Sequence, residues 1–202
     1  MARRSDHSRE EIKEMALSAA EQIVTEKSYA SLTARKVSAA IGYTVGSLYL
    51  VFKNLDDLCL QLNGRTLDML SQSLDEVFAS DQAPDQALRS LGRTYLQFAL
   101  DNRYRWGMVF EHMLPEDATV PEWYTEKNLS MIGHVESLFL QLQPACGRAE
   151  AELAARALWS SIHGVCILSL TGKLDSLDAK DIEKIIDSLV ASYLDGWQQS
   201  FS

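Results

Sequence analysis

Apolar residues recur along most of this chain every three or four positions, the spacing that places them on one face of an α-helix. The pattern is clear in residues 12–23 and again from Ile182 to Trp197. Alternation of apolar and polar residues, the pattern of a strand, is absent. We therefore expect an all-α protein of about nine helices, over residues 8–27, 33–41, 45–52, 55–79, 84–102, 103–114, 121–142, 147–172 and 178–199.

Few prolines interrupt the chain. Its four prolines lie in polar or short stretches that mark helix boundaries: Pro84, Pro115, Pro121 and Pro144. We find no internal repeat, low-complexity tract or long linker, so we expect a packed junction near residue 54. A length of 202 residues suits a three-helix head, residues 1–54, on a larger helical body, residues 55–202, with the head attached to the helix at 55–79.

Charge is distributed unevenly between these two parts. The formal net charge is -9, which by itself argues against a nucleic-acid partner. Residues 1–54 contain eight Lys or Arg and six Asp or Glu residues, so residues 55–202 contain the other eleven and twenty-two. A basic head on an acidic body agrees with DNA binding by the head, although charge alone does not assign that function.

The three cysteines, Cys59, Cys146 and Cys166, are far apart and form no CxxC pair, so we expect neither disulfides nor a zinc site. The N-terminal residues are charged rather than apolar, and no stretch reaches the roughly 20 apolar residues of a membrane span. We therefore expect a cytoplasmic protein without a membrane partner. We also expect no metal and no cofactor.

The segment Leu32–Leu58, LTARKVSAAIGYTVGSLYLVFKNLDDL, contains two short helical patterns separated by a glycine. Thr33 and Thr44 can cap the two helices, and Gly42 can form the turn between them. Leu48 and Phe52, four residues apart, should face the core. This spacing predicts a helix-turn-helix, although two short helices joined by a tight turn also occur in other helical bundles.

The second helix of this pair has small polar residues on its outer face. Thr44, Val45, Gly46, Ser47 and Tyr49 should point toward solvent or DNA. Small residues let a recognition helix lie deep in a major groove, where hydroxyl and methyl groups reach base edges. Asn54 can cap the following helix, whose first turn contains Asp56 and Asp57.

The chain resembles the TetR family of transcription regulators over about residues 8–58. The resemblance lies in the long helix expected at residues 8–27 and in the sequence that follows it, SLTARKVSAAIGYTVGSLYLVFKN. The resemblance implies a homodimer that reads palindromic operator DNA and a C-terminal domain that dimerises and binds a small-molecule effector. It places Thr33, Arg35, Tyr49 and Lys53 on phosphates, and Thr44, Val45, Gly46 and Ser47 on bases.

The sequence departs from the family pattern at two positions. Val51 stands where a His or Tyr is common, and Leu55 stands where a Lys is usual, so two phosphate contacts are in doubt. Arg3 and Arg4 either compensate as an arm on the DNA backbone or in a minor groove, or form a solvated chain end.

The body is rich in aromatic and sulfur-containing side chains, most of which we expect in its core. As a group they also suggest an effector pocket with apolar walls. The candidate pocket residues are Phe98, Trp106, Phe110, His112, Met113, Trp123, Met131, His134, Trp159 and His163. Polar anchors could come from Tyr95, Glu111, Asn128 and two of these histidines.

The segment around Trp159, His163 and Gly164 resembles a TetR branch whose C-terminal domain is named for its W-HG residues. His163 could bind an effector or only a backbone carbonyl. Gly164 permits close helix approach, and residues 182–197 form an apolar seam. The last two helices are therefore the predicted dimer interface, as a four-helix bundle.

An enzyme is the first alternative, but the sequence contains no HExxH, ExxH, GxSxG, GxGxxG or P-loop motif. Cys166 and His163 could pair on one helix face, but no orienting third group is near them. A ligand-binding or interaction module with a degenerate head is the second alternative. The favoured interpretation is a regulator, expected to be a repressor, whose effector moves the helix at 55–79 and so changes the spacing of the paired recognition helices.

Overall fold

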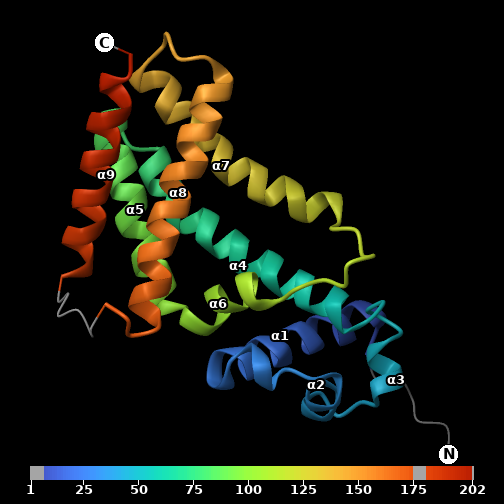
Figure 1. Ribbon diagram of the computed structural model, residues 1–202. Coiled ribbons are helices and arrows are strands. Elements are labelled where there is room, and N and C mark those ends of the chain that lie inside the picture. The colour runs from blue at the N-terminus through green and yellow to red at the C-terminus, as the bar shows by residue number, and fades with distance from the viewer. Residues whose placement is uncertain (1–6, 175–180, 202) are drawn as a thin grey trace, which may run out of the picture. The chain divides into compact units, whose positions relative to one another are not determined.

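The computed structural model describes residues 7–174 and 181–201, and within these ranges every regular element is a helix (Figure 1). The α-helices are α1 (Arg9–Lys27), α2 (Ala34–Ala40), α3 (Val45–Leu48), α4 (Leu55–Phe78), α5 (Pro84–Asp101), α6 (Arg103–Glu111), α7 (Glu122–Leu142), α8 (Arg148–Leu170) and α9 (Ile182–Gln199). A 3-10 helix, η1 (Tyr29–Ser31), follows α1 and has no counterpart in the predicted elements. The predicted all-α fold of about nine helices is confirmed.

Helix α6 is shorter than predicted. It ends at Glu111, three residues before the predicted end. Its last backbone bond runs from the His112 N–H to the Met108 carbonyl at 3.0 Å. Pro115 disfavours helical geometry at the residue before it, which explains why the helix does not continue. The predicted start of the last helix, residues 178–180, lies outside the described residues.

The chain forms two compact units. The first, here called the head unit, comprises residues 1–67 and 104–124, and the second, the body unit, comprises residues 68–103 and 125–202. Helix α4 contributes its residues up to Leu67 to the head unit and its remaining residues to the body unit. The predicted division at residue 54 concerns which part binds DNA, and it stays a prediction.

The head unit has one continuous apolar core. Its buried members come from α1, α2, α3, α4 and the segments between them, together with Met108 of α6. They are Ala16, Leu17, Ala20, Val24, Leu32, Val37, Leu48, Phe52, Leu58, Cys59, Leu62 and Met108. Helix α1 is fixed at its start by a capping box, in which Ser8 and Glu11 bond to each other's backbone N–H groups.

In the body unit, α5, α8 and α9 pack against one another (Figure 1). Gly92 of α5 allows their close approach, because a Cβ atom there would lie 2.9 Å from Ile186 Cγ2 and 3.3 Å from Ile162 Cδ1. Two hydrogen bonds of 2.6 Å from Arg93 to the Asp187 carboxylate join α5 to α9 at the surface. The body therefore has a tightly packed three-helix centre.

Candidate DNA-binding surface

Helix α2 is fixed at both ends by local hydrogen bonds. The Thr33 hydroxyl accepts a hydrogen bond from the Lys36 N–H at 3.3 Å, which is the predicted capping role. After the helix, Gly42 has a φ of 73°, in the left-handed region that glycine adopts readily. The N–H groups of Gly42 and Tyr43 then donate to carbonyls of α2 at 3.2 and 2.9 Å. This closure directs the chain into α3.

The segment predicted as a helix over residues 45–52 is α-helical only to Leu48. Thr44 caps it, because its hydroxyl accepts from the Ser47 N–H at 3.2 Å and lies 3.0 Å from the Ser47 hydroxyl. The N–H groups of Leu50 and Val51 donate to carbonyls only three residues back, at 3.2 and 3.1 Å. The coil therefore tightens after its first turn, as is common at helix ends.

Two apolar side chains hold α3 on the core of the head unit, as predicted. Leu48 is 1% exposed and Phe52 is 2% exposed. Val51 and Leu55, the two departures from the family pattern, are partly buried and pack against the same core. Their apolar character is explained by this packing.

None of the eight residues predicted to contact DNA is buried. Thr33, Arg35, Thr44, Gly46, Tyr49 and Lys53 are exposed, and Val45 and Ser47 are partly exposed. They lie on α2, on α3 and on the segments that flank these two helices. Their roles on bases and phosphates stay predictions.

The acidic side chains at the start of α4 contact other groups of the head unit. Asn54 caps the helix, as predicted, by accepting from the Asp57 N–H at 2.8 Å, and the Asp57 carboxylate accepts from the Lys53 N–H at 2.9 Å. The Asp56 carboxylate lies 3.1 Å from Nε2 of the buried His112. These contacts hold both carboxylates beside the helix end, whose positive dipole offsets their negative charge.

Two exposed residues beside these positions are missing from the predicted set. Leu50 is 66% exposed, and it follows Tyr49, which is 44% exposed. An apolar side chain there could contact a thymine methyl group. Lys36 adds a cation on α2, with its Nζ donating to the Ser31 carbonyl at 2.8 Å. Helical spacing from Leu48 places position 50 away from the core face, so the sequence contained a signal for it.

The start of the described chain also lies beside the helix-turn-helix. A ring nitrogen of His7 is 2.8 Å from the Tyr43 hydroxyl, in the segment between α2 and α3. Arg3 and Arg4, for which DNA contact was one of two alternatives, lie outside the described residues.

The ten residues predicted for the effector pocket are divided equally between the two units. Trp106, Phe110, His112, Met113 and Trp123 belong to the head unit, and Phe98, Met131, His134, Trp159 and His163 belong to the body unit. In the head unit, Met113 is 79% exposed, whereas His112 is buried against Asp56 and the Tyr29 ring. No single unit brings all ten together, and the pocket stays a prediction.

His163 forms a compact cluster with two neighbours in the body unit. Its Nδ1 lies 3.0 Å from the Tyr95 hydroxyl, and its ring stacks on Trp159 with centroids 5.3 Å apart. Burial lowers the pKa of His163, which favours the neutral ring near pH 7. On the same helix, burial raises the pKa of Cys166 to about 12, so its thiol is a poor nucleophile. The cluster suits hydrogen bonding and stacking.

Known families match both parts of the chain. A family described as bacterial regulatory proteins of the tetR type matches residues 16–62, which include α2 and α3. A second, described as the tetracyclin repressor-like C-terminal domain, matches residues 88–193. The chain belongs to the TetR family. This confirms the predicted family, whose members are DNA-binding transcription regulators and not enzymes, while membership of the W-HG branch stays a prediction.

One sequence relative and two solved structures are similar to most of the chain. The chain is 28% identical over 178 residues to the uncharacterized HTH-type transcriptional regulator Rv0681 of Mycobacterium tuberculosis, a match that covers 88% of this chain and 77% of that protein. A TetR-family regulator from Bordetella parapertussis has the same fold, with 18% identity, a TM-score of 0.62, and 94% and 97% of the two chains covered. The structure of RolR with resorcinol matches at 15% identity and a TM-score of 0.66, over 91% and 88% of the chains.

Proposed function

We propose that this TetR-family chain is a cytoplasmic, ligand-responsive repressor that binds a palindromic operator as a homodimer and is released by a small apolar or aromatic effector. The arrangement of α3 is the main support. Leu48 and Phe52 fix this helix on the core, while Thr44, Gly46 and Tyr49 remain exposed. The helix can then enter a major groove without leaving the core.

The exposed residues suit two kinds of DNA contact. Thr44, Val45, Gly46 and Ser47 are small, so the backbone of α3 can approach the base edges in a groove about 12 Å wide. Thr33, Arg35, Tyr49 and Lys53 offer hydroxyl and cationic groups to the phosphates that flank this groove. The first set would select the sequence and the second would position the protein.

A homodimer through α8 and α9 is supported by the exposed apolar side chains of α8, whereas four residues of the predicted α9 seam, Ile186, Val190, Leu194 and Trp197, are buried within the protomer. Leu153, Ile167 and Leu168 of α8 are 63%, 38% and 44% exposed. Among the described residues, no atom outside the adjacent residues and the nearby backbone of the same helix lies within 4 Å of a Cβ atom built at Gly164 of α8 or Gly196 of α9. In the described part of the chain, α8 also has the length and composition of a membrane-spanning helix, a property that core helices share. A second copy of α8 and α9 would cover this surface in a four-helix bundle.

The cluster of Tyr95, Trp159 and His163 supports an effector that is aromatic and carries a hydroxyl group. A neutral imidazole can accept a hydrogen bond from such a group, and the indole ring can stack on it. RolR, which shares the fold, binds resorcinol. The proposed switch is an equilibrium in which effector binding moves α4 and changes the separation of two recognition helices, which must lie about 34 Å apart on DNA.

Selection of binding sites from a random duplex library tests the proposal. We expect a palindromic site, repression of a reporter gene placed behind it, and relief of repression by resorcinol or another small phenol. Lys53→Ala should weaken binding to all sequences, whereas Arg93→Ala, the loss of an exposed cation on α5 of the body unit, should not. Failure of the folded dimer to select any site would favour an interaction module with a degenerate head.

A further inference from the structure

From Tyr104 on, helix α6 belongs to the head unit, although it begins 41 positions (103 against 62) after the last residue matched by the N-terminal family. Its Met108 is 1% exposed and is part of the head core. Two further contacts bind the following residues to α4: His112 lies 3.1 Å from the Asp56 carboxylate, and Tyr124 forms a side-chain hydrogen bond with Asn63. The DNA-binding head is thus completed by residues from the middle of the chain.

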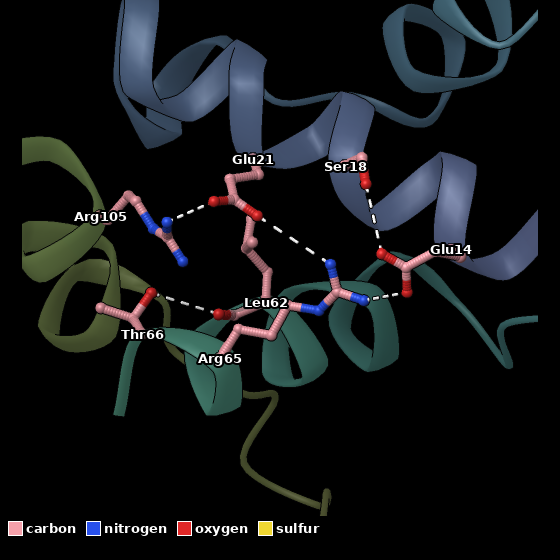
Figure 2. Close-up of polar contacts among 7 residues, drawn as sticks. All are labelled: Glu14, Ser18, Glu21, Leu62, Arg65, Thr66 and Arg105. Carbon is pink, nitrogen blue, oxygen red and sulfur yellow. Dashed lines mark hydrogen bonds and ion pairs between the residues drawn. The ribbon is translucent and has the colours of Figure 1, made fainter. Parts of the chain in front are cut away.

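A network of charges connects α1, α4 and α6 (Figure 2). Arg65 of α4 forms a hydrogen-bonded ion pair with Glu14 of α1, and its Nη1 lies 4.0 Å from Oε2 of Glu21, also on α1. Arg105 of α6 forms a hydrogen-bonded ion pair with Oε1 of Glu21. One carboxylate therefore joins arginines from two different helices.

The two arginine side chains differ in how deeply they are buried. The Arg105 side chain is 8% exposed, whereas the Arg65 side chain is 30% exposed. Within the described residues, Nε of Arg105 has no hydrogen-bond partner. Removing Glu21 would leave a buried guanidinium charge without this carboxylate, a far larger change than the loss of a pair at the surface. The pair with Glu21 therefore constrains α6 against α1.

We propose that Glu21 and Arg105 are positioning residues for operator binding, because their pair fixes α1 against α6 and thereby sets where α3 is held. Helix α1 packs directly against both α2 and α3, so a change in its placement moves the whole helix-turn-helix. Neither residue touches DNA in this account. The inference rests on the proposed function, since it requires that the dimer read two correctly spaced half-sites.

The test uses the operator selected by the full-length wild-type protein and two versions of it, with the half-sites one base pair closer or farther apart. Arg105→Met and Glu21→Gln should each weaken operator binding about tenfold or more, and should reduce the preference for the original spacing. The double variant should bind no more weakly than the singles, because all three lack the same interaction. Arg105→Lys should restore part of the preference. Arg93→Met is the matched control, because it breaks the ion pair with Asp187 in the body unit.

A merely stabilising pair would change the melting temperature but not the ratio of affinities for the three spacings. Folded, dimeric variants with wild-type affinity and spacing preference would therefore overturn the inference while leaving the proposed function intact. A wild-type protein that selects no operator would overturn both.

Amide hydrogen exchange of the wild-type protein covers the case in which the variants do not fold. If α6 positions the head for DNA binding, then DNA binding must in turn stabilise α6. Saturating operator should therefore slow exchange in residues 104–111 relative to an unrelated duplex, and unchanged exchange there would overturn the inference.

Discussion

Truncation of Met108 tests whether α6 contributes to the stability of the head. Met108→Ala removes three heavy atoms from a side chain that is 1% exposed in the core formed with α1, α2, α3 and α4. Loss of their burial costs about 2 kcal/mol, and a cavity raises typical costs for this change to about 2–5 kcal/mol. A domain stability of roughly 5–15 kcal/mol makes this a large fraction.

Met113 provides a matched control for this prediction. It lies five positions later, is 79% exposed, and should lose less than about 0.5 kcal/mol in the same change to alanine. Urea denaturation followed by circular dichroism and by tryptophan fluorescence, to which the buried Trp106 of the head unit contributes, measures both variants. Equal midpoints for Met108→Ala and Met113→Ala would refute the assignment of α6 to the head core.

Three further changes test other parts of the account. Gly92→Ala should lower the free energy of unfolding by about 1–3 kcal/mol in thermal melts, because its Cβ would lie 2.9 Å from Ile186. Gly133→Ala in α7, where a Cβ atom meets no such atom among the described residues, should not lower it. Thr44→Ala should cost about 1 kcal/mol through the lost cap and should weaken operator binding in anisotropy titrations. Burial lowers the pKa of His163 in the folded protein, so the unfolded chain binds a proton there more readily. The free energy of unfolding should therefore fall as the pH drops below about 6.5. His163→Asn should reduce the difference between the urea midpoints measured at pH 7.5 and 5.5.

The helices and the helix-turn-helix could be predicted because their signals are local. Thr33, Thr44 and Asn54 cap helices within three residues of themselves, and Gly42 closes the turn through its own backbone conformation. Spacing of four residues was enough to place Leu48 and Phe52 in the core. Such features depend little on the rest of the chain.

The role of α6 could not be predicted because its contacts are long-range. Glu21 and Arg105 are 84 positions apart, and no periodicity in either helix identifies the other as its partner. The residues predicted for the effector pocket were chosen because many are aromatic. Composition carries no information on long-range contacts, and these residues lie in two different units. His163 and Trp159 were linked correctly because they are four residues apart on α8.

The most direct test of operator recognition is a fluorescence-anisotropy titration of the wild-type protein against its selected operator and an unrelated duplex, at two salt concentrations. The account predicts one dimer per site, resistance to excess unrelated DNA, and binding that weakens as salt rises because phosphate contacts release counterions. A folded dimer that binds both duplexes with the same affinity would contradict the claim that α3 reads DNA sequence.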